Sequence, residues 1–332
     1  MSLAVVAAPR NDDAEIPILD LAPYLAGQPG ARERLGKQLC HALENIGFYF
    51  IKGHDVPQAL CDAAFAETAR FHAQPLDRKL VLRRNRDNVG YLPMSRSTDP
   101  DAAIKPNVNE AFFLKRDLPA DHPDVLAHKR FRGANMWPND LPGFRDTVVA
   151  YCDALEALVK KMMPLYAVAL DLPVDYFDKA FTELQYTLRM THYPHVERPA
   201  ENEFGIAPHS DTSFLTLLAQ NKVPGLSLRT RDGRWIDAPA LDGHFLVNGG
   251  DMLRRWTNDR FLATPHRAGQ ARYAIPFFVD CNIDWPMECL PTCVTSEQPA
   301  KYPRFTYAEY MSAYHDARHA QDSADGVRIQ AY

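Results

Sequence analysis

The chain has 332 residues, of which 46% are hydrophobic and 24% charged, and a formal net charge of −5 at pH 7. This length suits one large domain or two ordinary ones, and this composition is typical of a globular enzyme. The slight negative charge gives no electrostatic case for nucleic acid or a membrane surface as a partner. No apolar run reaches the roughly 18 residues of a bilayer span, and the first residues lack a signal-peptide pattern. The six cysteines fall at no metal-finger spacing, so we expect reduced thiols and a cytoplasmic location.

The first part of the chain predicts helices separated by short strands. Residues 16–21 alternate apolar and polar positions and predict a short strand. Leucines at helical spacing predict a helix over 31–46, and a second helix is expected from 57 to about 74. The run FYFIKG between them predicts a strand.

Residues 77–100 are polar, turn-rich and locally basic, which favours a surface loop. The alternative is a flap over a binding site, in which Tyr91 or Arg96 could touch a substrate. The segment NVNEAFFLKRDL that follows predicts a strand. Because successive side chains of a strand point to opposite faces, only one of Phe112 and Phe113 can face a pocket.

The longest predicted helix runs from about 144 to 170, with an apolar stripe at spacings of three and four residues. Pro164 should kink this helix or end it. A short helix, DYFDKAF, is expected next. From 185 to about 294 the pattern alternates, with turn signals roughly every 8 to 12 residues, which predicts a sandwich or barrel of short strands. TYAEYMSAYHDARHA predicts a C-terminal helix.

Three short motifs place an acidic residue two positions after a histidine, and only their context separates them. With 12 histidines and 42 acidic residues, chance predicts about 1.5 such pairs. The pairs at 122–124 and 195–197 lie in loops with prolines and are interpreted as surface residues. His209 and Asp211 open the run DTSFLTLL, which predicts a strand on which side chains two apart share a face. Both side chains could therefore meet one metal ion.

A third ligand is predicted at His266, directly after Pro265 and six residues before Arg272. Two imidazoles and one carboxylate leave about three positions of an octahedral ion open, which is the arrangement of non-haem iron(II) oxygenases. A zinc hydrolase could use the same three residue types. It would not explain a cationic Arg272 near the metal on the same sheet.

Alternation also predicts which side chains face the ion. On TLRMTHY three polar side chains share one face: Arg189, Thr191 and Tyr193. On RYAIPFF, Arg272 and Phe278 share a face. Arg272 could therefore pair bidentately with a carboxylate, with the Tyr193 hydroxyl as a second donor. Phe278 could line the same cavity.

At these residues the chain resembles the iron(II)/2-oxoglutarate-dependent oxygenases of the isopenicillin N synthase-like superfamily. The resemblance covers residues 16–280 and is carried by IPILDL, GFYFIKGHDVP, TLRMTHYP, HSD, VNGGDMLRRWTNDRFLATPHR and RYA. It implies an α+β fold with a double-stranded β-helix (jelly roll) core, flanked by N-terminal helices, a long central helix and a C-terminal helix. The N-terminal region would span 14–130 and the jelly-roll core 183–285, in one functional unit.

The resemblance also implies an activity. His209, Asp211 and His266 would be the iron(II) ligands, and the far carboxylate of iron-chelated 2-oxoglutarate would meet Arg272 and Tyr193. The enzyme would couple decarboxylation of 2-oxoglutarate with O2, to succinate and CO2, to hydroxylation, desaturation or cyclisation of a small organic substrate. We also expect ascorbate to stimulate it and a place in secondary metabolism.

One position departs from the family pattern. The usual anchor is Arg-x-Ser, whereas this chain has Arg272-Tyr273-Ala274. Losing a hydroxyl donor to a charged group could cost roughly 1.5–3 kcal/mol, or about 10- to 100-fold in affinity, if nothing replaces it. A water molecule or Thr191 could replace it. Two alternatives stay open: an iron(II) oxidase that does not use 2-oxoglutarate, and a non-catalytic binding module. Retention of both Arg272 and Tyr193 favours the use of 2-oxoglutarate.

The identity of the prime substrate is not encoded in any motif. A small to medium natural product or an amino-acid-like molecule is expected, with candidate contacts at Tyr91, Phe112, Phe113 and Phe278. The sequence defines neither the oxidative outcome nor the oligomeric state.

Overall fold

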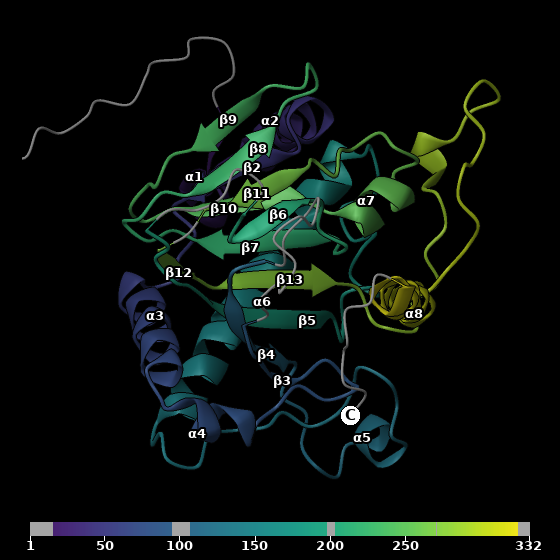
Figure 1. Cartoon of the computed structure of the whole chain (residues 1–332). Coiled ribbons are helices and arrows are strands. Elements are labelled where there is room, and N and C mark those ends of the chain that lie inside the picture. The colour runs from purple at the N-terminus through teal and green to yellow at the C-terminus, as the bar shows by residue number, and fades with distance from the viewer. Residues whose placement is uncertain (1–15, 95–106, 198–202, 270, 325–332) are drawn as a thin grey trace, which may run out of the picture.

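Two β-sheets face each other at the centre of the molecule, and helices cover the outer face of the larger sheet (Figure 1). The computed structural model describes residues 16–94, 107–197, 203–269 and 271–324. The larger sheet has nine strands in the order β1-β2-β10-β7-β13-β5-β4-β3, with β12 also paired to β5. The smaller sheet has four strands in the order β6-β11-β8-β9.

The strands are short, as the turn spacing predicted. Those of the larger sheet are β1 (Ile18–Asp20), β2 (Phe48–Lys52), β3 (Gly90–Leu92), β4 (Glu110–Lys115), β5 (Gln185–Tyr193), β7 (Leu215–Ala219), β10 (Phe245–Gly249), β12 (Arg272–Ala274) and β13 (Pro276–Asp280). Those of the smaller sheet are β6 (Ile206–His209), β8 (Leu226–Arg229), β9 (Trp235–Ala238) and β11 (His266–Ala268).

From β5 to β13 the chain passes back and forth between the two sheets, and in Figure 1 the smaller sheet lies in front of the larger one. Strands β5, β7, β10 and β13 belong to the larger sheet, and β6, β8 and β11 to the smaller one. This alternation is the topology of a double-stranded β-helix. The predicted jelly-roll core is therefore confirmed.

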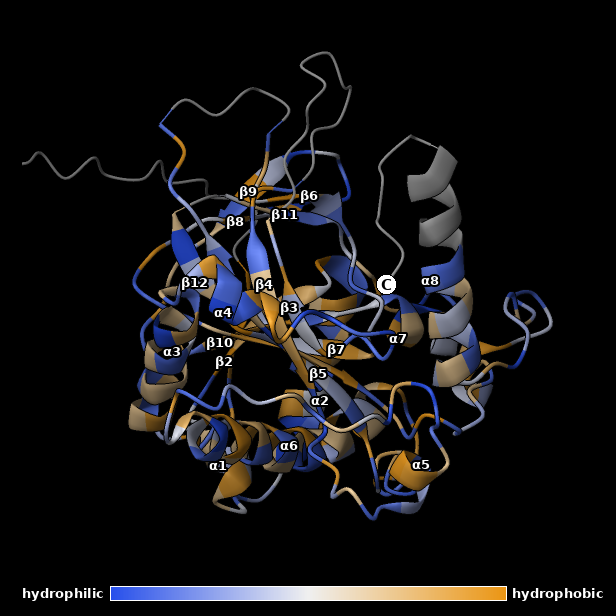
Figure 2. Ribbon diagram, turned by 60° about the horizontal axis from the view of Figure 1, so that its bottom comes forward, coloured by the Kyte–Doolittle hydropathy of each residue, from blue (hydrophilic) through white to orange (hydrophobic). Residues whose placement is uncertain are grey.

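The helices lie mainly on the outer face of the larger sheet. They are α1 (Ala22–Leu25), α2 (Ala31–Asn45), α3 (Gln58–His72), α4 (Leu76–Leu80), α5 (Pro123–Leu126), α6 (Phe144–Ala169), α7 (Asp251–Trp256), α8 (Tyr307–Ala324) and a 3-10 turn at Pro291–Cys293. Helix α6 packs against both α2 and α3. In Figure 2 the middle strands of the larger sheet carry hydrophobic colour, with α1, α2 and α6 together on one side.

Period-two alternation divides the apolar residues into two cores. On β7, Leu215 and Leu217 join the core beneath the helices, whereas Leu218 joins a second core between the sheets. The same alternation turns Thr216 toward the interior between the sheets. Polar side chains on this inner face are therefore available for chemistry, while the outer face supplies most of the hydrophobic stabilisation.

Local structure departs from the sequence predictions at several places. The expected helix at DYFDKAF is a series of turns, and α6 continues through Pro164 to Ala169. The expected loop over 77–100 contains α4 and β3, and its residues from 95 on lie outside the described part. RYAIPFF forms two strands, β12 and β13, separated at Ile275. Strands β3 and β12 form by pairing with β4 and β5, which the local sequence pattern does not contain.

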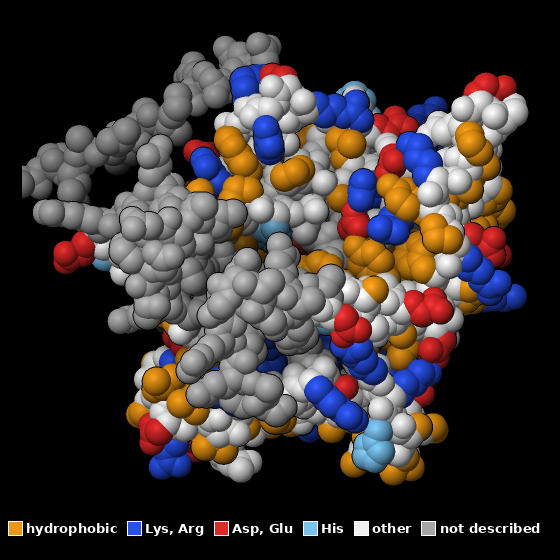
Figure 3. All heavy atoms as spheres, turned by 45° about the vertical axis from the view of Figure 1, so that its right-hand side comes forward, with side chains coloured by type: hydrophobic (Ala, Val, Ile, Leu, Met, Phe, Trp, Pro, Cys, Tyr) orange, Lys and Arg blue, Asp and Glu red, His pale blue; other side chains and the backbone are white. Residues whose placement is uncertain are grey.

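Within the described residues, no helix is long and apolar enough to cross a membrane. On the face seen in Figure 3, basic and acidic side chains are interspersed, without a large area of one sign. This distribution agrees with the small net charge of −5.

The contact between α2 and α6 requires a glycine. A Cβ atom added to Gly36 would lie 2.4 Å from Cγ1 and 2.8 Å from Cβ of Val168. Both distances are shorter than any real contact of this kind, so a side chain at position 36 would force the two helices apart.

Gly36→Ala should therefore destabilise the protein although alanine is the better helix former. Helix propensity alone would give a gain of about 1 kcal/mol, while overpacking costs about 1–3 kcal/mol. We expect a net loss in chemical denaturation, and recovery in the double variant Gly36→Ala/Val168→Ala. The exposed α2 substitution Gln38→Ala is the control, expected to change stability by less than about 0.5 kcal/mol. A stabilised Gly36→Ala variant would contradict the close packing.

Candidate metal centre

The structure brings His209, Asp211 and His266 together between the two sheets. His209 ends β6 and His266 begins β11, and the two are direct partners in the antiparallel ladder. Their ring centroids lie 4.4 Å apart. The Nε2 atoms of both histidines lie 3.7 Å from the same oxygen, Oδ1 of Asp211. Three potential ligand atoms thus converge on one point.

Each imidazole is oriented through its other nitrogen. Nδ1 of His209 donates to the carbonyl of Ala207 at 2.9 Å, and Nδ1 of His266 donates to the carbonyl of Thr264 at 3.2 Å. In a neutral imidazole this leaves the lone pair on Nε2, the atom that faces Asp211. Such backbone acceptors are typical supports of metal-bound histidines.

The two oxygens of the Asp211 carboxylate have different neighbours. Its Oδ2 accepts hydrogen bonds from Thr216 Oγ1 at 2.7 Å and from Asn248 Nδ2 at 2.8 Å. Both donors are uncharged, so Oδ1 keeps its negative charge for whatever lies between it and the imidazoles.

The charge states suit a metal. Burial is the main cause that lowers the pKa of His209, to about 4. Burial would raise the pKa of Asp211, but the two imidazoles and the bonds from Asn248 and Thr216 outweigh it, so the pKa is lowered. At neutral pH His209 is therefore a neutral imidazole and Asp211 a carboxylate, which are the states that a metal ion requires. This donor set fits iron(II) with positions left for further ligands.

Asp211 is not on a strand, which corrects the sequence argument. β6 ends at His209 and β7 begins at Leu215, so the aspartate lies in the turn between them. The start of α7 holds this turn, because the Asp251 amide donates to the Asp211 carbonyl at 2.8 Å. A Cβ atom added to Gly250 would lie 2.0 Å from the carbonyl oxygen of Ser213, so this close approach requires glycine. The expected ligand set is brought together, but by a turn and not by strand phase.

A candidate anion site lies on β5 and β12, on the inner face of the larger sheet. Arg272 pairs with Tyr193 in the ladder, and its guanidinium carbon lies 5.4 Å from the centroid of the Tyr193 ring. Its Nε is shielded from solvent without a hydrogen-bond partner, and it forms no ion pair with any residue that the structure describes. Burial lowers the pKa of Arg272. A partly buried guanidinium whose shielded Nε has no partner among the described residues fits a carboxylate ligand.

A residue with a hydroxyl group, Thr191, lies directly across the ladder from Ala274. Ala274 pairs with Thr191, and paired side chains of neighbouring strands share a face about 4.5–5.5 Å apart. Thr191 is fully buried, and its Oγ1 has no hydrogen-bond partner among the described residues. An unsatisfied buried hydroxyl beside the Arg272 cation also fits a bound anion.

A second group of possible metal ligands, His72, Glu110 and His192, lies on the opposite face of the same sheet. Here the ammonium of Lys79 donates to Glu110 Oε2 at 2.7 Å, and His192 Nδ1 donates to Oε1 at 2.9 Å. The Tyr91 hydroxyl also donates to Oε2. The carboxylate is already compensated by a lysine, so this cluster is a hydrogen-bonded hub and a poor site for a divalent cation.

Two of the four aromatic residues proposed for substrate contact lie on the inner face. Phe278 pairs with Thr216, which bonds Asp211, so both side chains share the metal face. Phe113 pairs with Arg189, whose guanidinium lies 5.4 Å from its ring centroid.

The other two do not reach the site. Phe112 is fully buried in the core beneath the helices, 4.3 Å between centroids from Phe71. Tyr91 is in the same core and bonds Glu110. The side chains of both residues point to the outer face of the sheet. The sequence alone does not show which positions of these two strands face outward.

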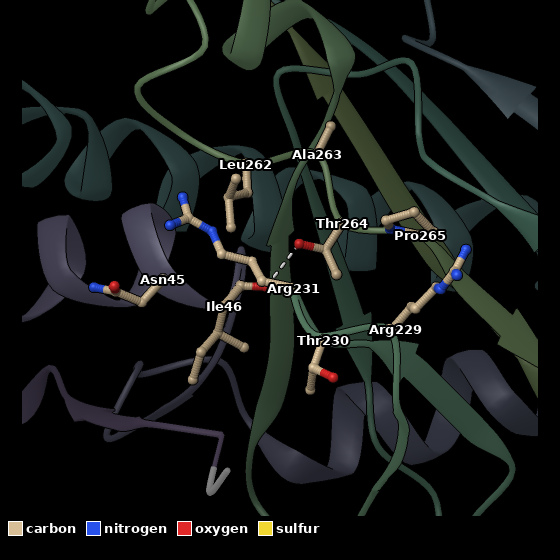
Figure 4. Close-up of a pocket in the computed structure, with 10 residues that line it drawn as sticks. Asn45, Ile46, Arg229, Thr230, Arg231, Leu262, Ala263, Thr264 and Pro265 are labelled. Atoms are coloured by element: carbon tan, nitrogen blue, oxygen red, sulfur yellow. Dashed lines mark hydrogen bonds between the residues drawn. The ribbon is translucent and has the colours of Figure 1, made fainter.

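A separate hollow of about 280 Å³ lies behind His266, where α2 ends (Figure 4). None of the three candidate ligands lines it. Figure 4 shows that Arg229 and Arg231 on its rim point away from each other, so they do not converge on one ligand. Thr264 on its wall donates through Oγ1 to the carbonyl of Ile46 at 2.7 Å, while its own carbonyl accepts from His266. Thr264 therefore ties His266 to the end of α2.

Two family models match the chain: the 2OG-Fe(II) oxygenase superfamily over residues 184–280, and the N-terminal region of non-haem dioxygenases of morphine synthesis over 16–140. The 2-oxoglutarate-Fe(II) type oxidoreductase hxnY of Emericella nidulans is 33% identical over 307 residues, covering 89% of this chain and 88% of the relative. The chain belongs to the 2-oxoglutarate-Fe(II) oxygenases.

Solved structures of this family agree over nearly the whole chain. A full-length Neurospora crassa protein, crystallised with alpha-KG and thymine, has a TM-score of 0.82 at 26% identity, covering 93% of this chain and 99% of that one. The dioxygenase for auxin oxidation from rice has a TM-score of 0.69 at 28% identity, covering 92% and 96%. The predicted family, fold and cofactors are confirmed. The protein is a 2-oxoglutarate-dependent iron(II) oxygenase that acts on a small organic substrate, and neither alternative activity is favoured.

Sequence reasoning missed several supports of this oxygenase site. Thr216 and Thr264 carry no motif, and their roles depend on which strands pair. Asn248, in the motif VNGGD, is a residue that the sequence does suggest as a support of the site, although its bond to Asp211 could not be predicted. Conversely, His122 accepts from the Asp124 amide at 3.2 Å and begins α5, so the competing motif there is a helix cap.

We predict that Asn248→Ala and Thr216→Val each weaken iron(II) affinity by about 10- to 100-fold, because each frees Asp211 to rotate away from the imidazoles. Anaerobic titration of iron(II) against a competing chelator measures the affinity. Asn45→Ala, an exposed substitution of the same type, should bind iron like the natural protein. Unchanged iron affinity in both Asn248→Ala and Thr216→Val would contradict the role given to the Asp211 hydrogen bonds.

Proposed function

We propose that His209, Asp211 and His266 are the iron(II) ligands of this oxygenase. The observation that carries the proposal is that the Nε2 atoms of His209 and His266 both lie 3.7 Å from Oδ1 of Asp211. The Nδ1 atom of each histidine donates a hydrogen bond to a backbone carbonyl, which fixes the ring. Without a cation, three acceptor atoms would face each other across a buried space, which is unfavourable. Iron(II), with 2-oxoglutarate and O2, supplies the oxidising chemistry.

We further propose that Arg272, Tyr193 and Thr191 bind the far carboxylate of 2-oxoglutarate. The guanidinium of Arg272 supplies the charge and two parallel donors. Thr191 supplies the hydroxyl that relatives place at the position of Ala274, and its buried Oγ1 has no competing partner among the described residues. The departure at Ala274 is thus compensated across the strand pair.

For the prime substrate we propose a small, flat, ring-containing molecule. Phe278 and Phe113 share the inner face with Thr216, and Phe278 pairs directly with Thr216, which bonds Asp211, so a ring stacked on Phe278 would lie near the metal. Aromatic contacts of this kind favour flat ligands. The similar Neurospora crassa protein was crystallised with thymine, and the rice relative is named for auxin oxidation. A cytoplasmic location, the absence of nucleic-acid and membrane partners, a stimulating effect of ascorbate and a place in secondary metabolism stay predictions.

The decisive experiment follows succinate and O2 together. The iron(II)-loaded protein should consume O2 and form succinate in step with loss of a substrate found by mass spectrometry among small cyclic compounds. His209→Ala should lose both iron and turnover, and retention of both would refute the ligand assignment. O2 uptake without succinate would instead support the oxidase, and absence of both signals with every compound would support a binding protein.

We predict that Thr191→Val raises the dissociation constant of 2-oxoglutarate by about 10-fold or more, because it removes a donor to a charged group. Ala274→Ser should restore affinity in the Thr191→Val background by supplying the family hydroxyl. Anaerobic calorimetric titration of 2-oxoglutarate into the iron(II)-loaded protein measures both effects. If Thr191→Val binds 2-oxoglutarate as tightly as the natural protein, the Thr191 hydroxyl does not take part in binding it.

A further inference from the structure

The short strand β12 carries Arg272 but has few restraints of its own. It has three residues and pairs only with β5 among the strands that the structure describes. One side-chain contact supports its backbone from the other edge, since Asn221 Nδ2 donates to the Tyr273 carbonyl at 2.7 Å. Alternation sends Arg272 inward and Tyr273 outward, so whatever holds the Tyr273 ring also orients Arg272.

The Tyr273 ring is held by two histidines on the outer face. It stacks on His192 at 4.9 Å between centroids and on His72 at 6.3 Å, with interplanar angles of 28° and 26°. The two histidine rings lie 5.7 Å from each other. The three rings therefore pack mutually, and α3, which ends at His72, packs against β12.

Both histidines are themselves fixed. His192 donates to Glu110, and His72 donates through Nε2 to the carbonyl of Met190 at 2.9 Å. Lys79 joins this arrangement, because its ammonium donates to Glu110 and to the His72 carbonyl at 3.1 Å. Met190 and His192 flank Thr191 on β5, so the contacts restrain the strand on either side of that residue.

Glu110 is the centre of this arrangement, and its charge is strongly held. Burial would raise the pKa of Glu110, but the hydrogen bonds from His192, Lys79 and Tyr91 outweigh it and keep the carboxyl ionised. We infer that Glu110, with His72, His192 and Tyr273, positions the 2-oxoglutarate anchor from the outer face of the sheet. This inference rests on the proposed role of Arg272, Tyr193 and Thr191.

The positioning role separates 2-oxoglutarate binding from iron binding. β12 and the end of β5 carry the anchor, whereas the iron ligands lie on β6, β11 and the turn after β6. Removing the ring contacts of Tyr273 should therefore weaken the binding of 2-oxoglutarate and leave the binding of iron(II) unchanged. A general loss of packing would weaken both.

The test compares Tyr273→Leu, which removes the flat ring, with Tyr273→Phe, which keeps it. 2-Oxoglutarate is titrated anaerobically into each iron(II)-loaded protein by calorimetry, and iron(II) affinity is measured separately. We expect Tyr273→Leu to raise the dissociation constant of 2-oxoglutarate by about 5- to 10-fold, in line with the stacking energy of one ring. Tyr273→Phe should stay within about 2-fold of the natural protein, and iron affinity should be unchanged in both.

Two further variants keep the result interpretable. Tyr273→Met fills a similar volume without a ring and replaces Tyr273→Leu should the latter not fold. Tyr176→Leu loses a ring contact with Phe177 at 5.2 Å, away from β12, and should bind 2-oxoglutarate normally. The KM for 2-oxoglutarate in succinate formation should rise in Tyr273→Leu with little change in kcat.

Unchanged 2-oxoglutarate affinity in Tyr273→Leu or Tyr273→Met would overturn the positioning role but not the proposed function. An equal loss of iron affinity would do the same. Arg272→Leu distinguishes this from failure of the proposed function. Should Arg272→Leu bind 2-oxoglutarate normally, the anchor itself is elsewhere and both proposals fall.

Discussion

The site depends on how the two oxygens of Asp211 are used. One oxygen is satisfied by the uncharged side chains of Thr216 and Asn248, and the other is left facing two imidazoles. Uncharged donors fix the carboxylate in place without neutralising it. Since the surroundings are buried, the remaining charge is costly unless a cation shares it. This cost favours a cation between Asp211 and the two imidazoles, in agreement with the proposed role of the three residues as iron(II) ligands.

The negative charge of Glu110 is balanced in a different way, although similar residue types surround it. Glu110 too is a buried carboxylate beside two histidines, but the amino group of Lys79 donates a hydrogen bond to it at 2.7 Å. The result is a stable structural hub and not a binding site. The Glu110 cluster lies on the outer face of the larger sheet and the Arg272 anchor on its inner face, so alternation along β5 connects these two: its odd positions carry Thr191 and Tyr193, and its even positions carry Met190 and His192. Chemistry on the inner face is thereby supported by a charge network on the outer face.

Much of this could be predicted from the sequence, and the exceptions have a common cause. The alternating pattern after residue 185 predicted the β-rich core, and residue type with spacing predicted His209, His266, Arg272 and Tyr193 as neighbours. The reason given for Asp211 was wrong, because the turn after β6 positions it. Thr216, Thr264 and the hub around Glu110 could not be predicted, since their contacts join segments separated by as many as 218 residues. Tyr91 and Phe112 were wrongly expected to face the site. The local sequence does not show which side chains of β3 and β4 point toward the helices and which point toward the site.

The pairing of β2 with β10 has a consequence for how the molecule assembles. Phe48 on β2 lies opposite Asn248 on β10, so a strand from the first matched region completes the sheet of the second. During synthesis β2 emerges long before its partner, and its edge must remain unpaired until most of the chain has been made. Pairing over so long a loop is slow, and exposed strand edges favour association with other chains. The rate at which the last third is translated therefore affects how much of the protein reaches the native state.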